Sequence, residues 1–209
     1  YKRQRALAQQ AFARTSSYDH AINSWMASNL ETGEYAKSEP DLQINAPAIQ
    51  TLRYGENPHQ SATIYVTDLS VPSVLTAKQI QGKQLSYNNV NDTDAALKLI
   101  SEFSDPTVAI IKHANPCGVA SADTLSDAWK AAYHCDSVSA FGSIIATNRI
   151  LDEETASLIT SIFIEVVIAP DATSKACEIL SSKPNIRLLL TGSMPNPEQP
   201  FNQVRTIIG

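Results

Sequence analysis

Cysteine is scarce in this sequence, and its placement excludes several classes of protein. The three cysteines, Cys117, Cys135 and Cys177, form no CxxC pair, which excludes zinc ribbons and redox centres built on that motif. Their odd number also argues against a disulfide framework of the kind found in small secreted domains. We therefore expect a reducing compartment, the cytoplasm.

Long apolar runs and an excess of basic residues are also missing. Runs such as Val108 to Ile111 are far shorter than the ~20 residues of a membrane-spanning helix, and the polar start, Tyr1 to Arg5, precedes no apolar segment typical of a secretory signal. The formal charge of −5 provides no positive field for nucleic acid, so an anionic ligand needs individually placed cations. We expect neither a membrane nor a nucleic-acid partner.

What the sequence does contain is an alternation of short apolar runs with helical patterns. Apolar runs between polar or Pro residues predict strands, and repeats at helical spacing predict helices. The predicted strands are residues 63–67, 107–112, 143–147, 165–169 and 186–190, and the predicted helices are 92–103, 124–135, 152–163 and 171–182. This order predicts an α/β fold with a mostly parallel sheet, in which ligands gather at the carboxyl ends of the strands.

The first 50 residues form a different region. Residues 2–27 have a helical pattern that Thr15 to Ser17 interrupts, which predicts two short helices, and residues 29–50 have the composition of an irregular linker. At the other end, the apolar segment Val204 to Ile208 has the pattern of a strand. Because the chain begins at Tyr1 and stops directly after this segment, we expect it to be a piece of a longer protein.

Three polar segments stand where strands should end. The first, Leu52 to Gln60, places Arg53 and Tyr54 beside a Gly and a Pro that favour a turn. It is either a well-bonded surface turn or a binding site for anionic groups. The third comprises Ser139 to Ser143, before one strand, and Glu165, at the start of the next. Gly142 would let a ligand approach the backbone, or it would simply allow a tight entry into a buried strand.

The second segment, Lys112 to Gly118, carries the strongest candidates for chemistry. Adjacent strand residues point to opposite faces, so Lys112 and His113 can serve one site only if the strand ends there, and we expect Pro116 and Gly118 to make the turn. A neighbouring cation disfavours the imidazolium and would help to keep His113 neutral, as a general base requires. The alternative is a capped strand end with a solvated lysine.

The same segment also partly matches the motifs of zinc-dependent nucleobase deaminases, but this interpretation fails. Such enzymes combine an H-x-E segment with P-C-x-x-C. Here Asn115 stands in place of the glutamate and Ala120 in place of the second cysteine. With the acid–base group and one ligand missing, we expect no metal.

Taken together, these strings resemble one enzyme family. LRYGENPHQ at 52–60, QGKQLSYNN and DTDAAL within 81–97, KHANPCGVA at 112–120, SAFG at 139–142 and EVVIAP at 165–170 are similar to the transformylase half of the bacterial AICAR transformylase/IMP cyclohydrolases. The segments Ala11 to Thr15 and Tyr18-Asp19 resemble the last helices of that family's cyclohydrolase domain. Five motifs in the right order make a chance match implausible.

The resemblance implies a reaction and roles for seven residues. The family transfers a formyl group from 10-formyltetrahydrofolate to the 5-amino group of AICAR, and its other domain closes the ring to IMP. His113 would be the general base and Lys112 would stabilise charge in the transition state. Arg53 and Tyr54 match nucleotide-binding positions, and Asn89, Gly142 and Glu165 match further substrate-site positions. Glu165 stands where some relatives carry Asp, and Ser143 where bacterial relatives often carry Gly.

The resemblance also implies an architecture. The expected fold is a three-layer α/β/α, cytidine deaminase-like domain, preceded by an N-terminal helical linker. Residues 1–50 would be the linker from the end of the cyclohydrolase domain and residues 51–209 the first half of the transformylase domain. The family works as a homodimer with sites near the interface, so this piece alone should be weak or inactive. Without the resemblance, the alternative is a non-catalytic α/β nucleotide-binding or interaction domain.

Overall fold

The structure is a computed structural model that describes residues 1–29, 44 and 46–199. The chain divides into two units, Tyr1–Ile44 and Asn45–Gly209. The expected strand at Val204 to Ile208 and most of the expected linker lie outside the described residues. Each unit is considered by itself below.

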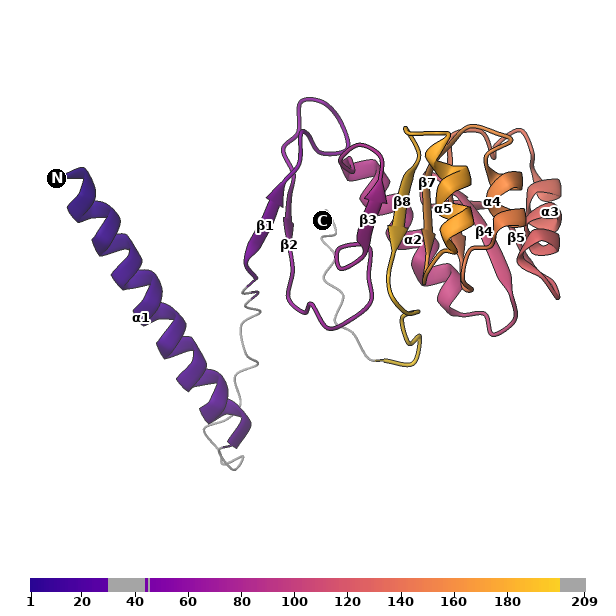
Figure 1. Cartoon of the computed structure of the whole chain (residues 1–209). Coiled ribbons are helices and arrows are strands. Elements are labelled where there is room, and N and C mark those ends of the chain that lie inside the picture. The colour runs from indigo at the N-terminus through magenta and orange to yellow at the C-terminus, as the bar shows by residue number, and fades with distance from the viewer. Residues whose placement is uncertain (30–43, 45, 200–209) are drawn as a thin grey trace, which may run out of the picture. The chain divides into compact units, whose positions relative to one another are not determined.

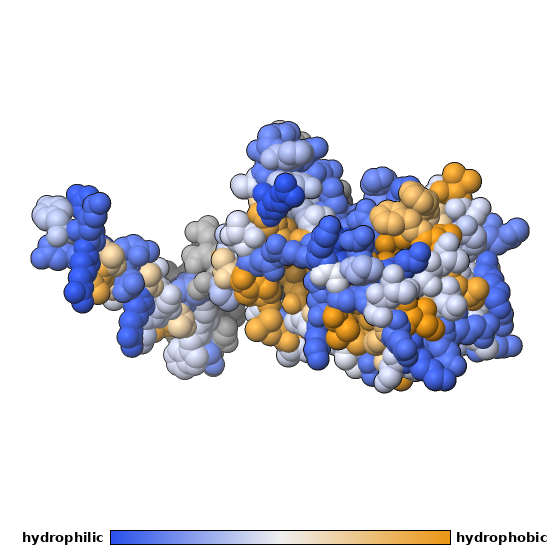
Figure 2. All heavy atoms as spheres, turned by 45° about the horizontal axis from the view of Figure 1, so that its top comes forward, coloured by the Kyte–Doolittle hydropathy of each residue, from blue (hydrophilic) through white to orange (hydrophobic). Residues whose placement is uncertain are grey.

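The first unit contains one helix, α1 (Lys2–Asn29), so the expected division into two helices is wrong (Figure 1). The hydroxyls of Thr15 and Ser17 donate hydrogen bonds to the carbonyls of Phe12 and Ala13, three and four residues earlier. Hydroxyl side chains bonded in this way remain compatible with a continuous helix. Figure 2 shows apolar residues of α1 interspersed among hydrophilic ones, and its large apolar side chains are exposed. None of the described helices is long and apolar enough to cross a membrane.

The second unit is built on two sheets. Strands β1 (Ala48–Thr51) and β2 (Thr63–Tyr65) form an antiparallel pair. The larger sheet has the order β3-β8-β7-β6-β4-β5 and comprises β3 (Lys78–Gln81), β4 (Thr107–Lys112), β5 (Asn115–Ser121), β6 (Ser143–Thr147), β7 (Ile164–Ala169) and β8 (Arg187–Leu190). It is mixed: β6, β7 and β8 are parallel neighbours, whereas β4 runs antiparallel to β5 and β6, and β3 to β8. Four of the six strands therefore share one direction.

Helices cover both faces of this sheet, which confirms the three-layer α/β/α fold. α2 (Tyr87–Ser101) covers one face, and α3 (Leu125–Cys135), α4 (Glu153–Ile159) and α5 (Ser174–Ser181) cover the other (Figure 1). Alternate strand residues supply the two cores: Val108 and Ile110 pack on the side of α3, and Ala109 and Ile111 on the side of α2. Such near-continuous apolar strands are typical of a sheet buried on both faces.

Side-chain caps fix where the helices begin. Thr124 caps α3, and Asp152 caps α4. Ser86 caps α2 and forms a reciprocal capping box with Asn89. α2 consequently starts five residues earlier than predicted, and α4 ends at Ile159, four residues before the predicted end.

Three strands were not predicted: β1, β3 and β5. β5 is the edge strand of the sheet, where Pro116 is tolerated because an edge strand need not donate every backbone hydrogen bond. Gly118 is required for packing, since a Cβ atom there would lie 2.0 Å from the carbonyl oxygen of Ala132 in α3. Because Pro116 and Gly118 are unfavourable in strands, the sequence did not predict β5, whose conformation is imposed by pairing with β4 and packing against α3.

Candidate functional site

The sheet register brings the second and third of the predicted polar segments together, at one end of the central strands. Ile111 of β4 pairs with Ile144 of β6, and Ser143 of β6 pairs with Ile164 of β7. The end of β4 at Lys112 therefore lies beside the start of β6, which in turn lies beside the start of β7. Because β4 runs antiparallel to β6, its carboxyl end meets the amino ends of β6 and β7.

His113 and Ala114 form the two-residue turn between β4 and β5. Lys112 pairs with Asn115 across the hairpin, and the φ angles of His113 and Ala114 are 54° and 57°. Two positive φ angles are typical of a type I′ hairpin turn and are costly for residues other than glycine. The expectation that Pro116 and Gly118 make the turn is wrong, because both lie within β5.

The imidazole of His113 is exposed at this turn. The backbone carbonyl of His113 accepts a hydrogen bond from Asn115 Nδ2 at 2.7 Å, which ties the turn to β5. Within the described part of the chain, no hydrogen bond or ion pair engages the imidazole itself. The ring is therefore free to meet a ligand while its backbone is held.

Lys112 is half-buried and points to the same face as Val108 and Ile110, the side of α3. Its ammonium donates a hydrogen bond to the backbone carbonyl of Phe141 at 3.0 Å. Gly142 follows with a φ of 74° and donates its N–H to the carbonyl of Phe163 at 2.8 Å. The rings of Phe141 and Phe163 lie 5.2 Å apart and are both largely exposed.

Lys112 interacts electrostatically with two further ionisable groups, Asp136 and Cys117. The hydroxyl and backbone N–H of Ser139, and more weakly the charge of Lys112, lower the pKa of Asp136. Burial raises the pKa of the Cys117 thiol, the charge of Asp136 raises it further, and Lys112 opposes the rise. The lysine charge is thus felt by a carboxylate and by a thiol.

Asn89 and Glu165 form a second group on the side of α2. The side-chain nitrogen of Asn89 donates to Glu165 Oε2 at 2.7 Å, and its side-chain oxygen accepts from the backbone N–H of Ser86 at 3.2 Å. Glu165 is the extra residue of a β-bulge, since Ser143 and Ile144 pair with Ile164 and Val166. A bulge redirects the side chain at a strand end. The Asn89–Glu165 pair therefore lies at the same edge as Lys112 but on the opposite face of the sheet.

Arg53 and Tyr54 belong to the loop between β1 and β2. The guanidinium carbon of Arg53 lies 5.9 Å from the centre of the Tyr54 ring. The loop is closed by hydrogen bonds from Gly55 N to Gln60 O and from Gln60 N to Asn57 O, as a well-bonded surface turn requires. Across the described residues, no hydrogen bond or ion pair joins Arg53 or Tyr54 to Lys112 or His113.

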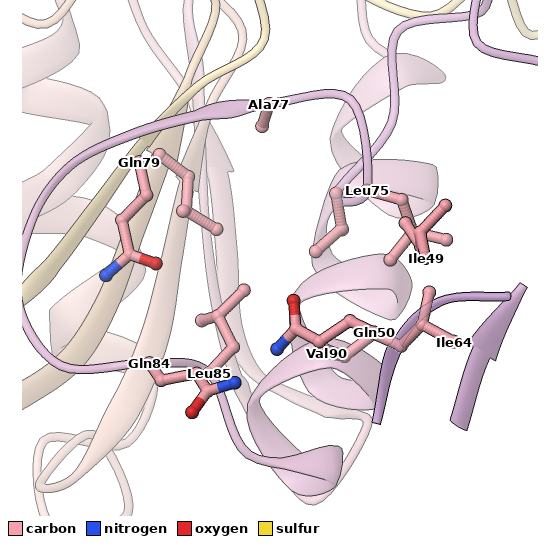
Figure 3. A pocket seen from close by; sticks show the side chains of 11 residues that line it. Ile49, Gln50, Ile64, Leu75, Ala77, Gln79, Gln84, Leu85 and Val90 are labelled. Atoms are coloured by element: carbon pink, nitrogen blue, oxygen red, sulfur yellow. The ribbon is translucent and has the colours of Figure 1, made fainter. Parts of the chain in front are cut away.

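A cavity of about 140 Å³ lies between this two-stranded sheet, α2 and β3 (Figure 3). Apolar side chains and three amides line it, and none of the seven predicted site residues does. The residues that Figure 3 labels are Ile49, Gln50, Ile64, Leu75, Ala77, Gln79, Gln84, Leu85 and Val90. The predicted site is therefore an open sheet edge and not this cavity.

No set of three His, Cys, Asp or Glu side chains in the described ranges is arranged to hold a metal ion. In the segment that resembles a zinc deaminase, Asn115 bonds the His113 carbonyl, where a deaminase would place its glutamate. The polar groups at these strand ends are thus an ammonium, an imidazole, amides, carboxylates, a thiol and backbone groups.

Comparison with known proteins decides the family. The profile of the AICARFT/IMPCHase bienzyme family matches residues 1–209. This chain belongs to that family. Relatives named "Bifunctional purine biosynthesis protein PurH" are 51% identical over the whole chain in Chelativorans sp., 54% identical over 97% of it in Paracoccus denitrificans, and 55% identical over 91% of it in Parvibaculum lavamentivorans. The chain covers 39%, 38% and 35% of these three relatives, respectively.

For this member of the AICARFT/IMPCHase family, sequence reasoning missed the acceptor of Lys112 and the side chains that bond within the turn that carries it. It selected Gly142 for its lack of a side chain but not the carbonyl of Phe141 just before it. It also overlooked Asp136, which ends α3, and the hydroxyl of Ser143. A backbone acceptor leaves no mark in the sequence, whereas an Asp three residues before a Ser is a recognisable turn signal.

Proposed function

We propose that this chain is the first half of a transformylase domain, residues 51–209, preceded by a linker, residues 1–50. The complete protein would transfer the formyl group of 10-formyltetrahydrofolate to the 5-amino group of AICAR in purine biosynthesis, in the cytoplasm. Membership of the AICARFT/IMPCHase family and the printed name of the relatives support this proposal. No resident metal or other cofactor is needed for it, because the folate is a co-substrate.

The observation that carries the proposal is the state of His113. Its imidazole is exposed, and its backbone is held in the left-handed region directly after Lys112. Backbone strain of this kind is concentrated at functional sites, where the surrounding structure imposes it. An exposed imidazole whose backbone is held in place suits a general base, because it can reach the proton of a bound substrate.

In the proposed reaction, the amine of AICAR attacks the formyl carbon and His113 accepts the proton that the amine loses. The carbonyl oxygen becomes an oxyanion, and the bond from the formyl carbon to the folate nitrogen then breaks as that nitrogen takes up a proton. Lys112 would stabilise the oxyanion, because only one of its three N–H donors is bonded, to Phe141, among the described groups. A placed base contributes roughly 10² to 10⁴ in rate and a preorganised donor roughly 10² to 10³.

The remaining candidates would bind substrate. Arg53 offers a fork of donors to anionic oxygens, and Tyr54 offers a ring and a hydroxyl. The carboxylate of Glu165 keeps acceptor capacity beyond its bond to Asn89, so it can accept from an amino group of the nucleotide. Gly142 is half-buried, has a positive φ and no side chain, so a ligand could approach the backbone next to Phe141. These groups lie on separate parts of the edge, and we propose that substrate bridges them.

The proposal includes a homodimer with sites near the interface, and a second half of the domain that completes the folate pocket. The chain alone should then be weak or inactive, and it should not close the ring to IMP. Detectable IMP formation from formyl-AICAR by these 209 residues would contradict the second statement.

The test is release of tetrahydrofolate when protein is mixed with AICAR and 10-formyltetrahydrofolate, with a control that lacks nucleotide. It is made first with this chain and then with the longer protein that contains it. In the longer protein, His113→Ala should lower nucleotide-dependent release by roughly 10² or more while the fold is kept. His134→Ala, which changes an exposed histidine of α3, is the matched control. Unchanged turnover in His113→Ala would leave a non-catalytic domain as the better description.

A further inference from the structure

The turn between α3 and β6 does more than connect them, because its Phe141 carbonyl receives the ammonium of Lys112. We propose that Asp136 and Ser143 are positioning residues, which fix Lys112 by fixing this turn from its two ends. That Lys112 then faces a developing oxyanion rests on the proposed function, whereas its positioning does not.

Asp136 holds the first end of the turn. Its carboxylate oxygen Oδ1 accepts the backbone N–H of Ser139 at 2.9 Å, and its backbone carbonyl accepts the N–H of Ala140 at 3.2 Å. A side-chain oxygen that captures a nearby N–H stabilises a turn in place of regular backbone bonding. These two hydrogen bonds of Asp136 fix the chain between the end of α3 and Ala140.

Ser143 holds the second end. Its side chain is fully buried, and its hydroxyl donates to the carbonyl of Ala140 at 2.7 Å, back across the turn. The N–H of Gly142 is bonded to Phe163 of the neighbouring segment at 2.8 Å. Phe141 therefore lies between Ala140 and Gly142, two residues whose backbone groups are both engaged, and its carbonyl has little freedom to move.

The carbonyl of Phe141 then orients Lys112. A lysine side chain rotates about four bonds, so an ammonium without a fixed partner samples many directions. The bond of 3.0 Å to a fixed acceptor selects one direction for the ammonium and leaves two donors for another partner. The charge of Lys112 lowers the pKa of Asp136, although no ion pair joins the two side chains in the described structure.

The test measures the freedom of Lys112 directly, as the rate at which an amine-reactive acetylating reagent labels it relative to the exposed Lys183. Both peptides are quantified by mass spectrometry over a series of pH values in the 209-residue chain. Ser143→Ala and Asp136→Ala should each raise the Lys112 to Lys183 ratio by about fivefold, since each removes one hydrogen bond that fixes the turn. Ser181→Ala removes a similar bond, from a hydroxyl to the carbonyl of Glu178, and should leave the ratio unchanged.

An unchanged ratio in both variants, with native circular dichroism, would overturn the positioning role. Asp136→Asn provides a folded variant that keeps an oxygen acceptor for the backbone N–H of Ser139, so it should raise the labelling ratio less than Asp136→Ala does. In the longer protein, Ser143→Ala should lower kcat for formyl transfer about tenfold or more with little change in the KM for AICAR. If labelling changes as expected but wild-type protein transfers no formyl group, the positioning stands and the proposed function fails.

Discussion

The side-chain nitrogen of Asn89 lies 2.7 Å from Glu165 Oε2, so the first turn of α2 is bonded to the bulge that begins β7. The same Asn89 side chain accepts the N–H of its own helix cap, Ser86. One buried amide thereby connects a helix start to a carboxylate 76 residues later in the chain. This relationship has a consequence for stability that is independent of any ligand.

Asn89→Ala should destabilise the fold even without substrate. Asn89 is only 4% exposed, and its loss leaves the Ser86 N–H and one Glu165 oxygen without their partner. We expect the free energy of unfolding in urea to fall by about 2 kcal/mol. Leaving the partly buried Ser86 N–H and Glu165 oxygen without a hydrogen-bond partner destabilises the fold by more than the net contribution of the lost bonds. Asn91→Ala changes an exposed side chain of the same helix and should cost less than about 0.5 kcal/mol. Equal losses in the two variants would argue that Asn89 serves substrate alone.

Ala114→Gly should stabilise the fold. Ala114 has a φ of 57°, a conformation that costs an alanine about 1 to 2 kcal/mol, and glycine removes this cost while adding freedom to the unfolded chain. The expected net gain is about 0.5 to 1 kcal/mol in urea unfolding. Ala131→Gly, on the exposed side of α3, should instead lose about 1 kcal/mol. A loss in both variants would show that the hairpin turn is not strained.

The Cys117 thiol should report the charges of Lys112 and Asp136. Its pKa is raised above the ordinary 9.0 by burial and by Asp136, and Lys112 opposes the rise. Asp136→Asn should therefore shift the pH profile of Cys117 alkylation to lower pH, and Lys112→Gln should shift it to higher pH. The rates are measured in a background of Cys135→Ser and Cys177→Ser. Shifts of the opposite sign would place these charges away from the thiol.

The raised thiol pKa also makes a contribution to stability that depends on pH. A group whose pKa is higher in the folded than in the unfolded chain binds its proton more tightly when folded. That contribution is complete below pH 9 and disappears as the pH rises through the folded-state value. Cys117→Ser should accordingly flatten the decline in stability above pH 9.

The buried centre of the fold was predictable from sequence, and its edges were not. β4 and β6 have the predicted bounds, because runs such as Val108 to Ile111 can only be buried. β3 was missed because Ile80 is its single apolar residue, and an edge strand needs little burial. Likewise, Phe163 was expected inside a helix but is 48% exposed and pairs with Phe141.

The candidate site was predictable as a set of segments but not as an arrangement. Spacing indicated that the strand should end at Lys112, and it does. Spacing could not show that β4 runs antiparallel to β6, which brings its end at Lys112 beside Gly142 and Glu165. Nor could it show that Lys112 and Glu165 occupy opposite faces, since the bulge at Glu165 changes the alternation.

The two outer strands of the larger sheet also affect how the chain behaves in concentrated solution. Another molecule that added a strand at β5 would meet Pro116, which has no N–H to offer, and one that added at β3 would have to desolvate the ammonium of Lys78. Both flanks thus disfavour cross-β growth. Colloidal stability is consequently built into β3 and β5, apart from the strand ends that carry Lys112 and Glu165.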